Sequence, residues 1–165
     1  ASWAKGTWET ISMLRGSGFS LALVGGGDGG SIDSLTEHAK SCEVGLWVAP
    51  RLDSSDLCSL IRGAVAVVSM AHSEPFGLTP IEAQTLGTPA LFVDEGGFRE
   101  TISDGVSGRL LPREDYSAWH VALEEANDED NRSSWSERGR AGITEMGLNP
   151  EVFSTRLEEI FLRLG

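Results

Sequence analysis

Apolar positions along the chain follow two alternating spacings, one typical of strands and one typical of helices. Short apolar runs that predict strands occur at residues 19–24, 44–49, 64–69, 89–93 and 109–111. The unbroken run 64–69 is typical of a strand buried on both faces of a parallel sheet. Strands that alternate with helices imply right-handed crossovers, so the chain predicts an α/β fold: a Rossmann-like parallel sheet flanked by helices.

Segments with helical spacing separate these runs, at residues 5–15, 31–40, 54–61, 79–86 and 97–103. Asp53 offers an N-cap for the helix at 54–61, with Asp56 three residues later. After Pro112 the pattern predicts extra C-terminal helices, at residues 115–126, 132–146 and 150–164, with an acidic turn at 127–131. Trp119 and Trp135 are expected to pack between these helices.

The length of 165 residues is sufficient for one domain, and we expect residues 1–165 to form a single domain. A net charge of −12 argues against a nucleic-acid partner, because such binding depends on Lys and Arg side chains that neutralise phosphates. No apolar run approaches the roughly 20 residues that span a bilayer, so no integral membrane segment is expected. Cys42 and Cys58 form no metal-binding or disulfide pattern, which favours a reducing cytoplasm.

Four predicted loops follow the strands at the sheet edge where α/β proteins bind ligands, at residues 25–30, 50–53, 70–78 and 94–97. The glycine-rich loop 25–30 lacks the spacing of a dinucleotide-binding loop, so we interpret it as facing the ligand or another domain. The sequence contains no Ser-His-Asp set or metal-ligand cluster that would suggest a self-contained hydrolase. His72 is interpreted as an ordinary loop residue.

Thr79-Pro80-Ile81-Glu82 has the composition of a helix N-terminus: Thr79 as the N-cap, Pro80 at the first helical position and Glu82 completing a capping box. The free N–H groups and the positive dipole end of such a helix favour an anion such as a diphosphate. Gly77, just ahead of it, lets the backbone approach a ligand closely. The alternative is that Thr79 and Glu82 only cap the helix.

Glu74 stands between a predicted buried strand and this helix start. One interpretation is an ordinary solvated carboxylate in a loop. The other follows from its spacing, because Glu74 and Glu82 flank the predicted phosphate-binding helix start. Two carboxylates so placed could each accept hydrogen bonds from sugar hydroxyls.

Glu74-Pro-Phe-Gly-Leu-Thr-Pro-Ile-Glu82, with the motifs around it, resembles the donor-site signature of glycosyltransferase family 4. The other motifs are Leu23-Val-Gly-Gly-Gly27, Leu86-Gly-Thr-Pro89, Gly96-Gly-Phe-Arg-Glu100 and Leu110-Leu-Pro112. The resemblance runs from residue 5 to about residue 126 and is dense only between residues 73 and 112. A spaced pair of glutamates alone would be a weak signal, whereas this ordered set is specific.

The resemblance implies the C-terminal, nucleotide-sugar-binding half of a retaining GT-B enzyme, which moves a sugar from a nucleoside diphosphate sugar to an acceptor hydroxyl. It also implies a preceding Rossmann-like domain that binds the acceptor, so we expect this chain alone to be inactive. No metal or other cofactor is implied, because the protein mostly positions the donor and stabilises the departing diphosphate. A cytoplasmic location is expected, with any attachment to a membrane surface made by the preceding domain.

Carried over position by position, the resemblance implies a role for each candidate site residue. Glu74, the candidate catalytic residue, would lie near the hydroxyls of the donor sugar, and Glu82 would bind the ribose. The substrate-binding set is completed by the N–H groups around Phe76, Gly77, Leu78 and Thr79 for sugar and phosphate, Arg51 and Leu52 at the base, Gly25 at the end of its strand, Gly97 beside the sugar and Lys5 at the diphosphate.

Two other functions remain open at this point. One is a non-catalytic module that binds a partner or a nucleotide sugar without turnover. The other is half of a nucleotide-sugar epimerase or hydrolase built on the same fold.

Overall fold

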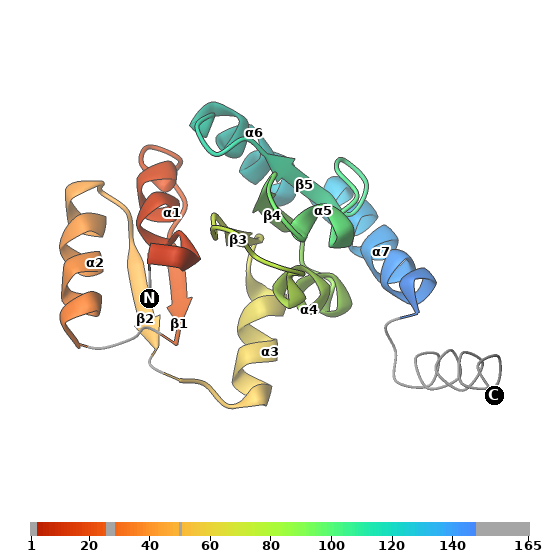
Figure 1. Ribbon diagram of the computed structural model, residues 1–165, viewed down its shortest axis with the longest axis horizontal. Helices are drawn as coiled ribbons and strands as arrows, with labels where there is room; N and C mark the ends of the chain where they lie inside the picture. Colours follow the sequence, from red (N-terminus) through yellow and green to blue (C-terminus); the bar gives the residue numbers. More distant parts are fainter. Residues whose placement is uncertain (1–2, 26–28, 50, 148–165) are drawn as a thin grey trace.

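The computed structural model describes residues 3–25, 29–49 and 51–147, in which helices alternate with strands (Figure 1). In chain order the elements are the 3-10 helix η1 (Trp3–Lys5), α1 (Thr7–Leu14), β1 (Leu21–Val24), α2 (Gly29–Ser41), β2 (Leu46–Ala49), α3 (Ser54–Gly63), β3 (Val67–Ser69), α4 (Leu78–Leu86), β4 (Ala90–Val93), α5 (Phe98–Thr101), β5 (Gly108–Leu111), α6 (Tyr116–Asn127) and α7 (Glu129–Met146). Every strand pairing between them is parallel, which confirms the predicted α/β fold. The helix predicted at residues 150–164 lies outside the described residues.

The strands form two parallel sheets, whereas the sequence predicts one. β1 pairs with β2, and β3, β4 and β5 form a second sheet with β4 in its centre. In the part of the chain that the structure describes, no ladder of hydrogen bonds joins β1 to β3. The parallel sheet flanked by helices is thus present as predicted but divided into two ladders, because the order of elements along a chain does not determine which strands pair.

The apolar run 64–69 forms a shorter and less buried strand than its composition predicts. Only Val67–Ser69 belong to β3, where they pair with β4, and all three are half-buried. A strand with a neighbour on one side only leaves its other edge partly accessible. The strand that is buried at every position is β4.

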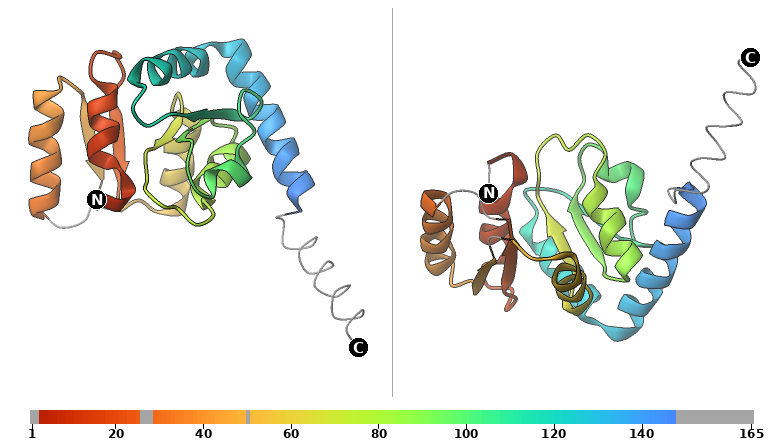
Figure 2. Two further views of the ribbon diagram at one scale, coloured as in Figure 1. Left: turned by 45° about the horizontal axis from the view of Figure 1, so that its top comes forward. Right: turned by 90° about the horizontal axis from the view of Figure 1, so that it is seen from below.

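Helices cover the two sheets in two groups. α1 and α2 contact each other, and α2 contacts β2 of the first sheet. α4 and α6 contact β4, while α7 lies against α4 and α6 on the outside (Figure 2). α1 also contacts β3 and α6, so it links the first group of helices to the second sheet. This link brings the start of the chain to the candidate site.

Side-chain caps test two of the predicted helix boundaries. The Asp53 carboxylate accepts a hydrogen bond from the N–H of Asp56 (2.8 Å), which confirms the predicted start of α3. The acidic turn predicted at residues 127–131 is wrong, because α6 and α7 are separated by Asp128 alone. The Asp128 side chain caps α7 by accepting a bond from the N–H of Asn131 (3.0 Å), so the residues that follow it are helical.

Trp119 lies at the centre of the core and is fully buried. Its indole N–H donates a hydrogen bond to the carbonyl oxygen of Pro112 (3.0 Å), so its one polar group is satisfied. Trp135 is also buried, and both residues therefore pack between helices as predicted. None of the described helices is long and apolar enough to cross a bilayer.

Trp119→Ala should lower the free energy of unfolding by about 3–5 kcal/mol, because the change leaves a cavity in the core. Urea denaturation followed by circular dichroism measures the loss. Val121→Ala on the same helix is the control: Val121 is 58% exposed, and its truncation should change stability by less than about 0.5 kcal/mol. Equal losses in the two variants would contradict this assignment of the core.

Candidate functional site

The predicted site residues lie beyond the carboxyl ends of the strands. Gly25 directly follows β1, Arg51 and Leu52 follow β2, the segment 74–79 lies between β3 and the first turn of α4, and Gly97 precedes α5. Ligands of open α/β sheets bind at this edge. The residues that follow these strands therefore lie at the edge where the sequence predicts the site.

The N-cap of the helix after β3 lies two residues earlier than predicted, and the capping box is not formed. Gly77 is the N-cap, with φ 80° in the left-handed region that favours glycine, and α4 starts at Leu78. Thr79 is thus the second helical residue, and its side chain caps nothing. Pro80 stands third, and Glu82 lies in the second turn. The alternative that Thr79 and Glu82 serve only as caps is wrong.

This shift changes what the start of α4 offers to a ligand. The N–H groups of Leu78 and Thr79 have no hydrogen-bond acceptor among the described residues. Leu78, Thr79 and Glu82 are exposed, and Glu82 makes no hydrogen bond or ion pair within the described ranges. The first turn therefore presents unused donors and the positive end of the helix dipole to solvent.

Lys5 and Glu74 form an ion pair, although 69 positions separate them in the sequence. The Lys5 ammonium donates to Glu74 Oε2 at 3.2 Å. The Lys5 side chain is 66% exposed and that of Glu74 is 25% exposed, so the ammonium is accessible to solvent and the carboxylate less so. The structure thus brings together two residues that sequence reasoning assigned to one ligand.

The backbone around Lys5 is fixed against the loop after β3. The N–H of His72 donates to the carbonyl oxygen of Ala4 (2.8 Å). A Cβ on Gly6 would collide with the backbone of Met70, and φ at Gly6 is 64°. Glycine at this position therefore allows the approach that places Lys5 beside Glu74.

Gly97 has a structural role that the sequence did not indicate. Its N–H donates to the carbonyl oxygen of Glu74 (2.9 Å), and a Cβ on Gly97 would collide with the backbone of Phe76. Gly97 was predicted to let the backbone pass a sugar, and the close approach seen in the structure is to protein backbone. The loop after β4 thus supports the loop that carries Glu74 and Phe76.

Gly25, Arg51 and Leu52 stand apart from this cluster. The N–H of Gly25 donates to the carbonyl oxygen of Ala49 (2.9 Å), which joins the ends of β1 and β2. Arg51 is exposed and Leu52 half-buried. No hydrogen bond or ion pair connects these three residues to segment 74–79 within the described residues. Their predicted roles at the base stay predictions.

Sequence reasoning missed a charged cluster beneath the site, made of Glu9, His72, Glu95 and Arg113. Arg113 Nε and Nη2 donate to the two oxygens of Glu95 (2.9 and 2.7 Å). His72 Nε2 lies 3.0 Å from Glu9 Oε1, and this contact requires the proton on Nε2, since a carboxylate can only accept. Glu95 and Arg113 each follow a predicted strand at the ligand-binding edge, but their positions in the sequence do not indicate that they pair.

The charges of this cluster lower the pKa values of both carboxyls. Burial acts to raise the pKa of Glu9, but the hydrogen bond from His72 and the nearby positive charges outweigh it. Hydrogen bonds from Arg113 lower the pKa of Glu95 below its ordinary value against a smaller opposing effect of burial. Glu9 Oε2 is buried without a partner among the described residues, so this carboxylate is only partly satisfied.

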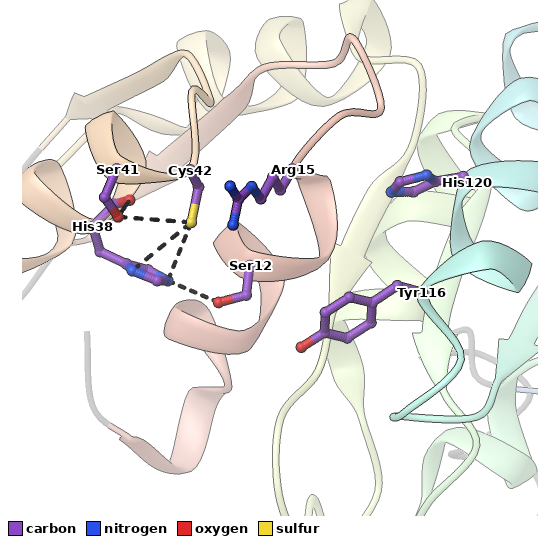
Figure 3. A pocket seen from close by; sticks show the side chains of 7 residues that line it. All are labelled: Ser12, Arg15, His38, Ser41, Cys42, Tyr116 and His120. Carbon is purple, nitrogen blue, oxygen red and sulfur yellow. Dashed lines mark hydrogen bonds between the residues drawn. The ribbon is translucent and has the colours of Figure 1, made fainter.

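A separate pocket of about 550 Å³ lies between α1, α2 and α6. Figure 3 shows the residues that line it: Ser12, Arg15, His38, Ser41, Cys42, Tyr116 and His120. The imidazoles already have protein partners, with His38 Nε2 2.8 Å from Ser12 Oγ and His120 Nε2 2.7 Å from the carbonyl oxygen of Met13. None of the predicted site residues lines this pocket, which lies toward the end of α1 remote from Lys5.

Glu95→Gln should destabilise the protein more at about pH 7 than at about pH 3. The lowered pKa of Glu95 means that its contribution is present above the unfolded pKa of about 4.3 and is lost as the pH falls through the folded pKa. Urea unfolding across this range measures the difference. Glu100→Gln, at an exposed position of α5, is the control and should change stability at neither pH. A loss that is independent of pH would contradict the charge-dependent role of Glu95.

Curated proteins similar to this chain are glycosyltransferases by name. The chain is 41% identical over 86 residues to a D-inositol 3-phosphate glycosyltransferase of Corynebacterium kroppenstedtii, an alignment that covers 52% of this chain and 19% of that protein. It is 31% identical over 137 residues to the protein of the same name from Gordonia bronchialis, covering 80% and 28% of the two chains. The chain thus spans between about a fifth and three tenths of the length of these relatives.

Two solved structures share the fold. Sucrose-phosphate synthase from Thermosynechococcus elongatus superposes with a TM-score of 0.86 at 23% identity, over 99% of this chain and 43% of that one. HepE from Anabaena, solved in complex with UDP-glucose, superposes with a TM-score of 0.75 at 19% identity, over 96% and 46%. The family described as "Glycosyl transferases group 1" matches residues 7–142, and the chain belongs to this family.

Proposed function

We propose that this chain is the donor-binding domain of a retaining glycosyltransferase that moves a sugar from a nucleoside diphosphate sugar to an acceptor hydroxyl. The observation that carries the proposal is the Lys5–Glu74 ion pair beside the unused N–H groups of Leu78 and Thr79. A cation and a helix N-terminus suit a diphosphate, while a carboxylate suits sugar hydroxyls. Membership of the glycosyltransferase family supports the same donor.

A bound donor would change the pairing of the charged groups in the site. Lys5 is paired with Glu74, and a bound diphosphate would offer its ammonium a second anionic partner at the start of α4. Glu74 would then be available to accept hydrogen bonds from the sugar, close to the transferred carbon. Because the negative charge on the diphosphate increases as the glycosidic bond breaks, Lys5 and the N–H groups of α4 would stabilise the leaving group.

The proposed arrangement makes no use of a metal ion, because Lys5 and the helix dipole supply the positive charge. Glu82 would bind the nucleoside half of the donor. It is an exposed carboxylate one turn into α4, suited to accept hydrogen bonds from the ribose hydroxyls. HepE, which shares the fold, was solved with UDP-glucose, and this supports a nucleoside diphosphate sugar as the ligand here.

We further propose that a second, Rossmann-like domain completes the enzyme and binds the acceptor. The chain spans 43% and 46% of the two solved structures described above, and less of its curated relatives. The same proposal includes retention of anomeric configuration, assignment to glycosyltransferase family 4 and a cytoplasmic location. The resemblance of segment 74–82 and its surroundings supports them.

Glu82→Ala should weaken nucleoside diphosphate binding about tenfold, the cost of about one hydrogen bond to a charged group. Its stability should change by less than about 0.5 kcal/mol, because Glu82 caps nothing. Titration of the isotopically labelled chain with UDP, GDP and ADP, followed by NMR, measures affinity and locates the ligand. Glu137→Ala, an exposed glutamate of α7, is the matched control. If none of the three nucleotides binds while the fold is intact, a partner-binding module replaces the proposed function.

Lys5→Ala should weaken the binding of a nucleoside diphosphate more than that of the matching monophosphate, and leave the nucleoside unaffected. The reason is that the ammonium interacts with phosphate charge, which also predicts a smaller difference at high salt. Calorimetry with UDP, UMP and uridine measures the three affinities. Lys40→Ala serves as the control, since Lys40 is another exposed lysine in an ion pair, with Glu37 (2.9 Å). An equal loss for all three ligands would contradict a phosphate contact.

A further inference from the structure

The Arg113 guanidinium donates hydrogen bonds to three residues and is more buried than the ion pairs on the surface near the site. Besides its two bonds to Glu95, Nη1 donates to the carbonyl oxygen of Met70 (2.7 Å) and Nη2 to that of Ala71 (3.3 Å). Its side chain is 15% exposed, whereas the Arg99–Asp94 pair nearby is 59% and 45% exposed. Exposed pairs contribute little, but a guanidinium held by a carboxylate and two carbonyl groups is fixed in one orientation.

The partners of Arg113 belong to the two loops that build the candidate site. Met70 and Ala71 begin the loop that leads from β3 to Glu74. Glu95 lies in the loop that leads from β4 to Gly97, and the N–H of Gly97 donates to the carbonyl oxygen of Glu74. Arg113 therefore joins the two loops at their bases, while the Gly97–Glu74 bond joins them at the site.

His72 and Glu9 extend the same contact to α1. His72 Nε2 lies 3.0 Å from Glu9 and 3.3 Å from Arg113 Nη1. Because the Nε2 proton is directed at Glu9, the guanidinium is a neighbouring donor and not its partner. The negative charge of Glu9 offsets the unfavourable closeness of the guanidinium to the His72 N–H. Glu9 stands four positions after Lys5, so the start of the chain is tied to the same cluster.

We propose that Arg113 is a positioning residue for donor binding, which acts through Glu95 and the carbonyl groups of Met70 and Ala71. It touches neither Glu74 nor the start of α4, and it sets the spacing between the loops that carry them. Lysine cannot replace it, because a single ammonium cannot bridge a carboxylate and two carbonyl groups in one plane. The inference about binding rests on the proposed function; the coupling between the loops does not.

Arg113→Lys tests the proposal with two independent measurements. In the unliganded protein, hydrogen exchange of the Gly97 N–H should accelerate about tenfold relative to core amides of β4, because its bond to Glu74 is no longer supported from below. Binding of UDP should weaken about tenfold, with the melting temperature kept within a few degrees of the unaltered protein. Glu95→Gln should accelerate exchange at Gly97 in the same direction.

Arg109→Lys is the matched control, because Arg109 lies on β5 and also bridges two carboxylates, those of Asp104 and Glu125. It should leave Gly97 exchange and UDP affinity unchanged. Unchanged exchange at Gly97 in Arg113→Lys overturns the proposal, as does an acceleration shared by all amides, which indicates general destabilisation. If UDP does not bind the unaltered chain, the proposed function fails, whereas the exchange measurement still decides whether Arg113 couples the loops.

Discussion

The candidate site depends on the close approach of two backbone segments that come from different crossovers. The N–H of Gly97 bonds to the carbonyl oxygen of Glu74 at 2.9 Å, and a side chain on Gly97 would prevent the contact. Gly6 allows a second approach of the same kind, against Met70. These contacts hold the main chain on both sides of Glu74, so that its carboxylate meets Lys5 while α4 begins immediately beyond. Such a site is fixed by backbone packing, and its few charged side chains need little reorganisation to bind.

Local patterns predicted most elements, because the period of apolar residues is set by the geometry of the element itself. The same patterns could not predict which strands pair. The run 64–69 has the composition of a central strand, yet β3 has a neighbour on one side only and stays half-buried. The burial of β3 depends on what lies along its second edge, and the sequence of the six residues 64–69 does not specify this neighbour. Conversely, β4 was indistinguishable in sequence from its neighbours and is the buried strand.

The candidate site shows the same division. Segment 74–82 was recognisable from its motif, but the capping box was wrong, because Gly77 in a left-handed conformation takes the N-cap position two residues before Thr79. Thr79 and Glu82 were predicted to cap the helix, and neither does so. Arg113 was missed for a different reason: its partners lie 18 to 43 residues away, and a single arginine after a strand gives no sign of them. Sequence patterns identify residues whose role depends on their neighbours in the chain. A cluster such as this one forms only when the tertiary structure brings distant loops together.

The net charge of −12 poses a problem for any anionic ligand, and the local arrangement answers it. Screening limits the influence of a surface charge to about 8 Å at physiological ionic strength, so the distant acidic residues of α6 and α7 have little effect at the start of α4. The proposed contacts of the diphosphate are local: Lys5, the N–H groups of Leu78 and Thr79, and the positive end of the helix. Glu74 would repel it, but Lys5 already balances this charge. A compact phosphate site needs only such local groups, whereas nucleic acid requires neutralisation over an extended face.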